Sequence, residues 1–141
     1  KQPQIQKKER VVILNILILS CIGFICSVYL FIVEQKVKQD PLYKASCDIS
    51  DKFSCTKPIL TPYSKLFFIS NALLGMVFYM IVGILALIDQ TTLIFYISIP
   101  ACLVSIYLAL ISYLKIEVFC IVCTIIYLIN ISILFLSYLN L

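Results

Sequence analysis

Along the chain, long uncharged apolar stretches alternate with shorter polar connections. The apolar stretches occupy residues 11–33, 66–88, 91–114 and 118–139. A helix needs about 20 apolar residues to cross the hydrocarbon core of a bilayer, and each stretch meets that length. The pattern therefore predicts four transmembrane helices, joined by a long polar loop over 34–65 and by tight turns at 89–90 and 115–117.

The short connections fix how the predicted helices are arranged. Tight turns make the second, third and fourth helices antiparallel neighbours, so the expected fold is a single-domain, all-α, up-down-up-down bundle. In the second helix, Gly75 and Gly83 allow neighbouring helices to approach closely. Both termini then lie on one side of the membrane, and the long loop lies on the other. Residues 1–10 are polar and basic and are expected to be poorly ordered.

The composition favours a membrane location. Apolar residues make up 62% of the 141 residues and charged residues 13%, with a mean hydropathy of +1.08. A soluble domain of this size could not cover so much apolar surface, so we expect a multi-pass protein of the lipid bilayer. The net charge of +4 is spread among lysines and acids in the polar segments, so no nucleic acid is expected as a partner. A signal peptide is the alternative for 11–33, but its apolar core is normally about 7–15 residues, which favours an uncleaved helix.

The distribution of positive charge suggests an orientation. The tail 1–10 is basic, which favours a cytoplasmic N-terminus, although the loop 34–65 also carries six lysines. Disulfide chemistry persists on the luminal or exterior side of a membrane, and the loop contains cysteines. We therefore expect cytoplasmic termini and a luminal or exterior loop, in the endoplasmic reticulum membrane of a eukaryote or the inner membrane of a bacterium.

The chain has seven cysteines and no histidine. The absence of histidine excludes a catalytic Cys–His pair and disfavours zinc and haem sites, so no metal is predicted. Cys47 and Cys55 lie in the long loop, and Cys120 and Cys123 lie at the start of the last predicted helix. The predicted topology brings these four to one membrane surface. The other three, Cys21, Cys26 and Cys102, are predicted to be packing residues.

Each cysteine pair allows a structural and a redox interpretation. Cys120 and Cys123 are three residues apart near a helix start, where they share one face and the helix dipole stabilises a thiolate. The alternative is that they are small, buried, inert residues. Cys47 and Cys55 could form a structural disulfide, or could exchange with the second pair through mixed disulfides. Spacing alone leaves both interpretations open.

Asn71 and Tyr127 are polar residues near the same membrane face as the cysteines. Tyr127 follows Cys123 by four residues, on the same face of the predicted helix. Such residues often serve only helix–helix hydrogen bonds or the membrane interface. Two donors that converge on a carbonyl oxygen would instead position a quinone and stabilise the charge that forms on reduction. Asn130 and Ser132 complete a glycosylation sequon, but it lies inside a predicted span and should not be modified.

An ordered set of short motifs resembles the vitamin K epoxide reductase family. The motifs are Ser46-Cys47-Asp48, Ser54-Cys55, Ser70-Asn71 with Gly75 and Phe78-Tyr79, and Phe119-Cys120 with Cys123, Tyr127 and Asn130. The family consists of four-helix membrane oxidoreductases that act between thiols and quinones. The resemblance runs from the first predicted span to the last, in the family's order.

The resemblance implies a route for electrons. Cys47 would take electrons from a thioredoxin-like partner or from substrate protein thiols, and Cys55 would relay them to Cys120. Cys123 would face the quinone.

The resemblance also implies the ligand. Asn71 and Tyr127 would hydrogen-bond the oxygens of a quinone substrate, which could be vitamin K, its epoxide, ubiquinone or menaquinone. No tightly bound cofactor is expected. The chain resembles a shorter-loop member, since 56–70 is shorter than in vertebrate members, and one without the thioredoxin-like domain fused to many bacterial members.

Two other interpretations stay open. The chain could be a disulfide-generating catalyst that uses ubiquinone or menaquinone. It could also be a non-enzymatic four-span protein with a structural Cys47–Cys55 disulfide. A non-homologous bacterial disulfide-forming family carries its paired cysteines in an earlier loop, the reverse of the order seen here.

Overall fold

The computed structural model describes residues 2–40, 42, 65–66, 69–116 and 121–140. Cys47, Cys55 and Cys120 lie outside these residues. The described elements are helices α1 (Gln2–Gln39), α3 (Asn71–Leu87), α4 (Thr91–Leu110) and α5 (Ile121–Leu139), the π-helical segment η2 (Ile111–Ile116), and the short strands β1 (Lys65–Leu66) and β2 (Ile69–Ser70).

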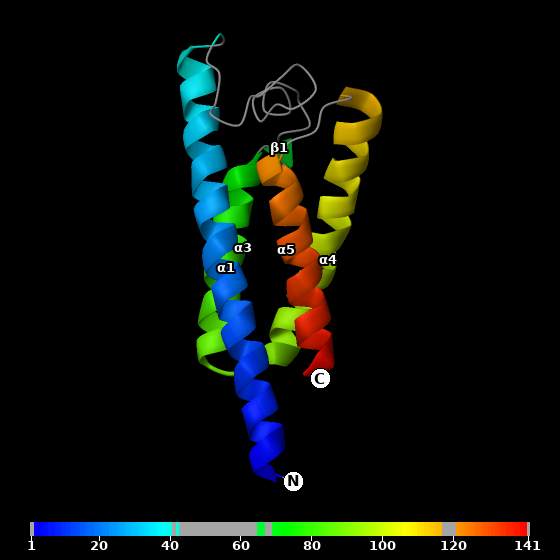
Figure 1. Cartoon of the computed structure of the whole chain (residues 1–141). Coiled ribbons are helices and arrows are strands. Elements are labelled where there is room, and N and C mark those ends of the chain that lie inside the picture. The colour runs from blue at the N-terminus through cyan, green and yellow to red at the C-terminus, as the bar shows by residue number, and fades with distance from the viewer. Residues whose placement is uncertain (1, 41, 43–64, 67–68, 117–120, 141) are drawn as a thin grey trace.

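The four α-helices stand side by side as an elongated bundle (Figure 1). α1 packs against α3 and α5, and α4 packs against α5. The start of α1 and the end of α5 lie at the same end of the bundle, as the tight turns predicted, and α1 extends beyond the other helices there. The turn between α3 and α4 contains Asp89, whose φ of 61° lies in the left-handed region.

α1 is longer than the apolar stretch that it contains. The expectation that residues 1–10 are poorly ordered is wrong for residues 2–10, which form its first turns. Pro3 lies in the first turn, where backbone N–H groups make no hydrogen bond within the helix, so the N–H that proline lacks is not needed. The Gln, Lys, Glu and Arg residues that follow favour helix. At the other end, Pro41 disfavours a helical conformation at Asp40, which directly follows the last residue of α1.

Three helical segments of the described chain are long and apolar enough to cross a membrane: Pro3–Gln39, Thr91–Lys115 and Ile121–Leu139. α3 is apolar but has 17 residues, which gives a length of about 25 Å. It begins later than the predicted stretch 66–88 because β1 and β2 pair there as an antiparallel hairpin, with Lys65 opposite Ser70 and Leu66 opposite Ile69. The described part is therefore all-helical apart from this hairpin.

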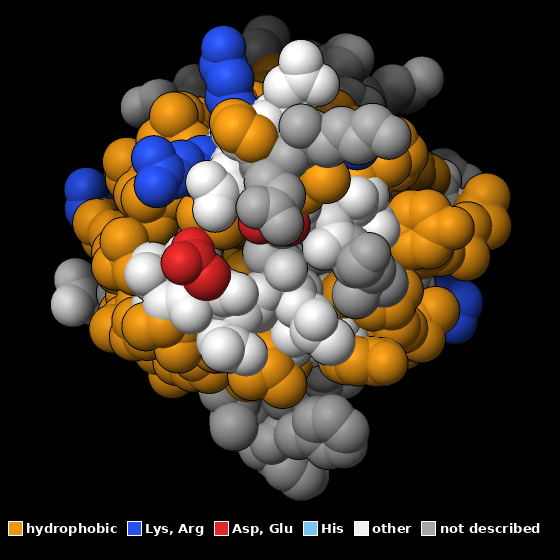
Figure 2. All heavy atoms as spheres, turned by 90° about the horizontal axis from the view of Figure 1, so that it is seen from below, with side chains coloured by type: hydrophobic (Ala, Val, Ile, Leu, Met, Phe, Trp, Pro, Cys, Tyr) orange, Lys and Arg blue, Asp and Glu red, His pale blue; other side chains and the backbone are white. Residues whose placement is uncertain are grey.

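The outer surface of the bundle is apolar, as a lipid-facing surface requires. Seen from the end that carries the termini, hydrophobic side chains surround the rim (Figure 2). Large exposed hydrophobic residues occur on α1, α3, α4 and α5, for example Ile25, Ile84, Leu103 and Leu128. These side chains are not covered by other parts of the described protein, so contact with lipid is the environment that suits this apolar surface.

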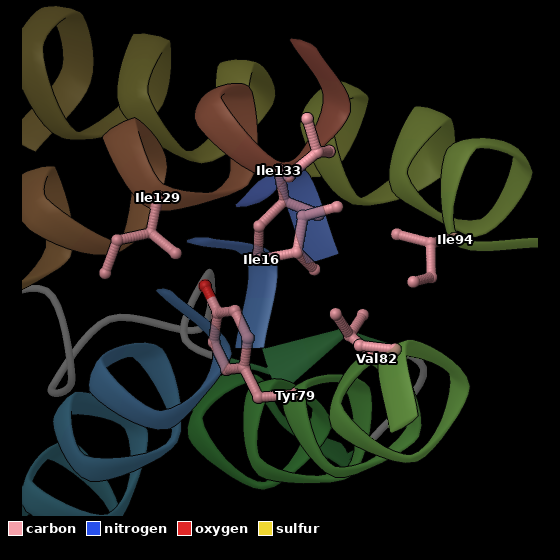
Figure 3. Packing of buried hydrophobic residues seen from close by; sticks show 8 residues of the cluster. Ile16, Tyr79, Val82, Ile94, Ile129 and Ile133 are labelled. Carbon is pink, nitrogen blue, oxygen red and sulfur yellow. The ribbon is translucent and has the colours of Figure 1, made fainter. Parts of the chain in front are cut away.

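The main core draws on all four helices. Its buried members are Val12 and Ile16 of α1, Tyr79, Val82 and Ala86 of α3, Ile94 of α4, and Ile129 and Ile133 of α5. Figure 3 shows that their side chains converge between the helices, with the hydroxyl group of Tyr79 directed into the bundle. A second, smaller cluster, which we call the upper cluster, consists of Leu30, Val33 and Val37 of α1.

Small residues allow α1 and α3 to approach closely. A Cβ atom placed on Gly23 would lie 2.5–2.8 Å from three ring atoms of Tyr79, and one on Gly75 would lie 2.6 Å from Ser27 Oγ. A Cβ on Gly83 would meet Ser20 Oγ at 3.6 Å, which is an ordinary contact. Close approach therefore depends on Gly75, as predicted, and on Gly23, whereas Gly83 contributes little to it.

Candidate functional site

Cys123 lies near the start of the described part of α5 and faces the bundle interior. The residue is half-buried, and its side chain packs against the upper cluster of α1. Val122 and Ile126 of α5 and Ala72 of α3 pack against the same cluster. The side chain of Cys123 therefore lies where α1, α3 and α5 pack together. The start of α5 is at the end of the bundle opposite the chain termini (Figure 1).

Asn71 and Tyr127 border the same region. Asn71 is the first residue of α3 and directly precedes Ala72, which contacts the upper cluster. Tyr127 follows Ile126, which also contacts that cluster, and lies one turn beyond Cys123. Both residues are half-buried. Among the described residues, the structure thus brings three of the predicted site residues to one end of the bundle.

The other predicted site residues, Cys47, Cys55 and Cys120, lie outside the described residues, so their roles stay predictions. Of the cysteines predicted to be packing residues, Cys102 is buried and Cys26 is half-buried, but Cys21 is exposed on α1. Cys21 therefore faces outward from the bundle. In the part of the chain that the structure describes, no three His, Cys, Asp or Glu side chains gather as a metal site would require.

A buried hydrogen-bond network lies deeper in the bundle. The Tyr79 hydroxyl donates to Asn130 Oδ1 at 2.5 Å, and Asn130 Nδ2 donates to Ser105 Oγ at 2.7 Å. Ser105 Oγ donates in turn to the Ala101 carbonyl oxygen at 2.8 Å, and Cys102 Sγ donates to the Asn130 carbonyl oxygen at 3.3 Å. The network joins α3, α4 and α5.

Sequence reasoning missed this network. Tyr79 entered only through the family resemblance, Asn130 entered through that resemblance and a glycosylation sequon, and no motif singled out Ser105. The available signal was the presence of amide and hydroxyl side chains inside long apolar stretches, where unpaired polar groups are costly. Their pairing could not be predicted, because Tyr79 and Asn130 are 51 residues apart.

A buried carboxylate also lies at the end of the bundle that carries Cys123. Glu34 is only 3% exposed and follows Val33 of the upper cluster. Its Oε1 atom lies 3.3 Å from Nζ of Lys38, one helical turn away. A carboxylate in apolar surroundings needs such pairing because desolvation disfavours its charge. Glu34 is the first residue of the segment 34–65 that the sequence pattern assigned to the polar loop, whereas the structure places it inside α1.

η2 is tied to the start of α5. The Tyr113 hydroxyl and Thr124 Oγ1 lie 2.9 Å apart and share a hydrogen bond. Thr124 directly follows Cys123, so this contact anchors the backbone next to the sulfur. The end of the bundle that carries Cys123 is thus held from α1, α3 and η2.

Comparison with known protein families gives a match over most of the chain. Residues 14–138 match the Vitamin K epoxide reductase family. The chain belongs to this family.

Membership in the vitamin K epoxide reductase family accounts for the apolar helices, because this is a family of membrane proteins. The protein is a membrane oxidoreductase of the thiol and quinone class, and its partners in general are a quinone, thiols and membrane lipid. The matched range begins in α1 and ends in α5. It therefore includes Cys123 and also Cys47, Cys55 and Cys120, which lie outside the described residues.

Proposed function

We propose that this vitamin K epoxide reductase homologue passes two electrons from protein thiols to a quinone within the membrane. The observation that carries the proposal is the position of Cys123, which packs on the upper cluster beside the start of α3 in a chain of this family. A quinone that enters from lipid would meet the sulfur where two polar residues, Asn71 and Tyr127, are also found.

The proposed reaction balances between a dithiol and a quinone. The thiols of Cys120 and Cys123 lose two electrons and two protons and form a disulfide, and the quinone gains them and becomes a hydroquinone. The Cys55 thiolate then attacks Cys120, which forms a Cys55–Cys120 disulfide and releases Cys123 as a thiolate. The Cys47 thiolate then attacks Cys55, which breaks the Cys55–Cys120 bond, releases Cys120 as a thiolate and moves the disulfide to Cys47–Cys55, where a dithiol partner reduces it. With the epoxide as substrate, the same two electrons and two protons yield the quinone and water.

The proposed quinone position follows from the two polar residues. Asn71 begins α3 and Tyr127 lies in the second turn of the described part of α5. Their amide and hydroxyl groups would donate hydrogen bonds to the quinone oxygens, where negative charge develops during reduction. Because donors in a water-poor site are already oriented, the charge is stabilised without solvent reorganisation.

The proposed membrane arrangement has four spans. α3 supplies about 25 Å, which is slightly short of a hydrocarbon core of about 30 Å, and the β1–β2 hairpin continues the chain toward the surface. The termini would be cytoplasmic, and the loop with Cys47 and Cys55 would be luminal or exterior. A thioredoxin-like protein or substrate protein thiols would supply electrons on that side, in the endoplasmic reticulum or the bacterial inner membrane.

Quinone reduction by the full chain in lipid nanodiscs tests the proposal. With a membrane-permeant dithiol as reductant, the wild type should convert quinone to hydroquinone, and Cys123→Ser should not. Cys21→Ser is the matched control because Cys21 is exposed on the outer face of α1, and it should keep wild-type turnover. Turnover that persists in Cys123→Ser would refute the mechanism, and a protein inactive with vitamin K, its epoxide, ubiquinone and menaquinone would favour a structural role.

A further inference from the structure

The buried hydrogen-bond network around Asn130 joins α3, α4 and α5, and α1 packs against it. Tyr79, Ser105 and Asn130 are 2%, 4% and 8% exposed, and they come from α3, α4 and α5. α1 participates through Gly23, which leaves room for the Tyr79 ring. The amide of Asn130 therefore has a donor on one side and an acceptor on the other, both from neighbouring helices.

The residues of this network lie on the same faces of α3 and α5 as the residues of the proposed quinone site. Asn130 is three residues beyond Tyr127 and seven beyond Cys123, so the three share one face of α5. Tyr79 is eight residues beyond Asn71, again on one face of α3. At about 1.5 Å per residue, the network lies about 10 Å deeper than Cys123.

Apolar packing alone fixes the rotation of α5 poorly. The buried neighbours of Asn130 on α5 are Ile129 and Ile133, which have no directional preference. Because lipid tails are as apolar as these side chains, a rotated helix would lose little hydrophobic free energy. Hydrogen bonds are directional, so the bonds of Asn130 to Tyr79 and Ser105 favour one rotation, and the Tyr113–Thr124 bond near the start of α5 supports it.

We infer that Tyr79, Asn130 and Ser105 are positioning residues, whose hydrogen bonds set the rotation of α5 and so hold Cys123 and Tyr127 toward the quinone. This inference rests on the proposed function. A rotation of about 20° moves a side-chain tip by about 2 Å, given a helix radius of about 5–6 Å. Misplacement by about 1 Å can reduce the rate of a reaction by about 100-fold, so such a rotation is large enough to matter.

A proton relay is the alternative role for these groups, and the geometry disfavours it. The described chain of bonds ends at the Ala101 carbonyl oxygen, which accepts but has no proton to pass on. Toward the end with the termini, Val82, Ile94 and Ile133 are fully buried and fill the core (Figure 3). Within the described residues, the hydrogen bonds of the network thus do not lead out of the bundle.

Tyr79→Phe tests the inference with a minimal change. The variant keeps the ring that packs on Gly23 and removes only the hydroxyl that donates to Asn130. We expect kcat/KM for the quinone to fall by about tenfold, the effect of one lost buried hydrogen bond. Ile129→Val is the control, because Ile129 is buried next to Asn130 and loses only one methylene, and it should stay within about twofold of wild type.

A double-mutant cycle separates positioning from general destabilisation. Because the network holds both Tyr127 and Cys123, adding Tyr79→Phe to Tyr127→Phe should lower kcat/KM by clearly less than the tenfold expected for Tyr79→Phe alone, since the share that acts through Tyr127 is already lost. Fully additive effects, or an equal loss in Ile129→Val, would overturn the inference. Wild-type kcat/KM in Tyr79→Phe would overturn it while leaving the proposed function intact, whereas absence of turnover in the wild type would refute both.

Discussion

Gly23→Ala is the substitution for which the structure gives the most specific expectation. The added methyl carbon would lie 2.5 Å from Cζ, 2.6 Å from Cε1 and 2.8 Å from Cε2 of Tyr79. Ordinary contacts of this kind are about 3.4–4 Å, so the ring or α1 must move by nearly 1 Å. The ring cannot easily do so, because it is 2% exposed and its hydroxyl is bonded to Asn130.

The expected cost combines opposing terms. Overpacking of a core costs about 1–3 kcal/mol, and loss of the Tyr79–Asn130 hydrogen bond adds about 0.5–1.5 kcal/mol. Alanine is favoured over glycine inside a helix by about 0.5–1 kcal/mol, which offsets part of this. The free energy of unfolding should therefore fall by about 1–3 kcal/mol.

Gly83→Ala is the matched control. Its methyl carbon would lie 3.6 Å from Ser20 Oγ, so the same substitution meets no overlap and should leave stability unchanged or raise it by up to about 1 kcal/mol. Reversible unfolding in mixed micelles with increasing dodecyl sulfate, followed by circular dichroism, measures both variants. Equal stability of Gly23→Ala and Gly83→Ala would show that the Tyr79 ring does not lie against α1.

Three further predictions concern packing, binding and electron entry. Gly75→Ala should destabilise the fold by about 1 kcal/mol, and Ser27→Ala should restore stability in the double variant because it removes the oxygen 2.6 Å from the new methyl; no restoration in the same unfolding assay would contradict this contact. Tyr127→Phe should weaken quinone binding by about 1–2 kcal/mol, and an unchanged KM and kcat would remove Tyr127 from the site. Cys47→Ala should lose turnover driven by a reduced thioredoxin-like protein but keep turnover driven by a membrane-permeant dithiol, so equal loss with both reductants would contradict its role as the entry cysteine.

The class of fold could be predicted from the sequence because its signal is direct. Long uncharged stretches must be helical in a bilayer, where each backbone polar group needs an internal partner. α4 begins at Thr91 and α5 ends at Leu139, the same residues at which two apolar stretches begin and end. The length of α1 and the β1–β2 hairpin could not be predicted in this way, because hydropathy does not distinguish a helix from other structures near the membrane surface.

Sequence patterns also do not show which face of each helix points into the bundle. A membrane helix is apolar toward lipid and toward its neighbours, so hydrophobic periodicity does not reveal which face is buried. The motif around Cys123 indicated the chemistry of the site. The hydrogen-bond partners of Asn130 are Tyr79 and Ser105, which lie on two other helices, so only the three-dimensional structure identifies them.

The central claim is that Cys123 is the sulfur that reacts with the quinone, and a single-turnover experiment tests it most directly. A variant with Cys47→Ala and Cys55→Ala keeps Cys120 and Cys123 without the loop cysteines. After prior reduction and removal of the reductant, one equivalent of quinone should yield about one hydroquinone per protein, with a Cys120–Cys123 disulfide seen by peptide mass spectrometry. Adding Cys123→Ser should abolish both products, and hydroquinone formed without Cys123 would contradict the account.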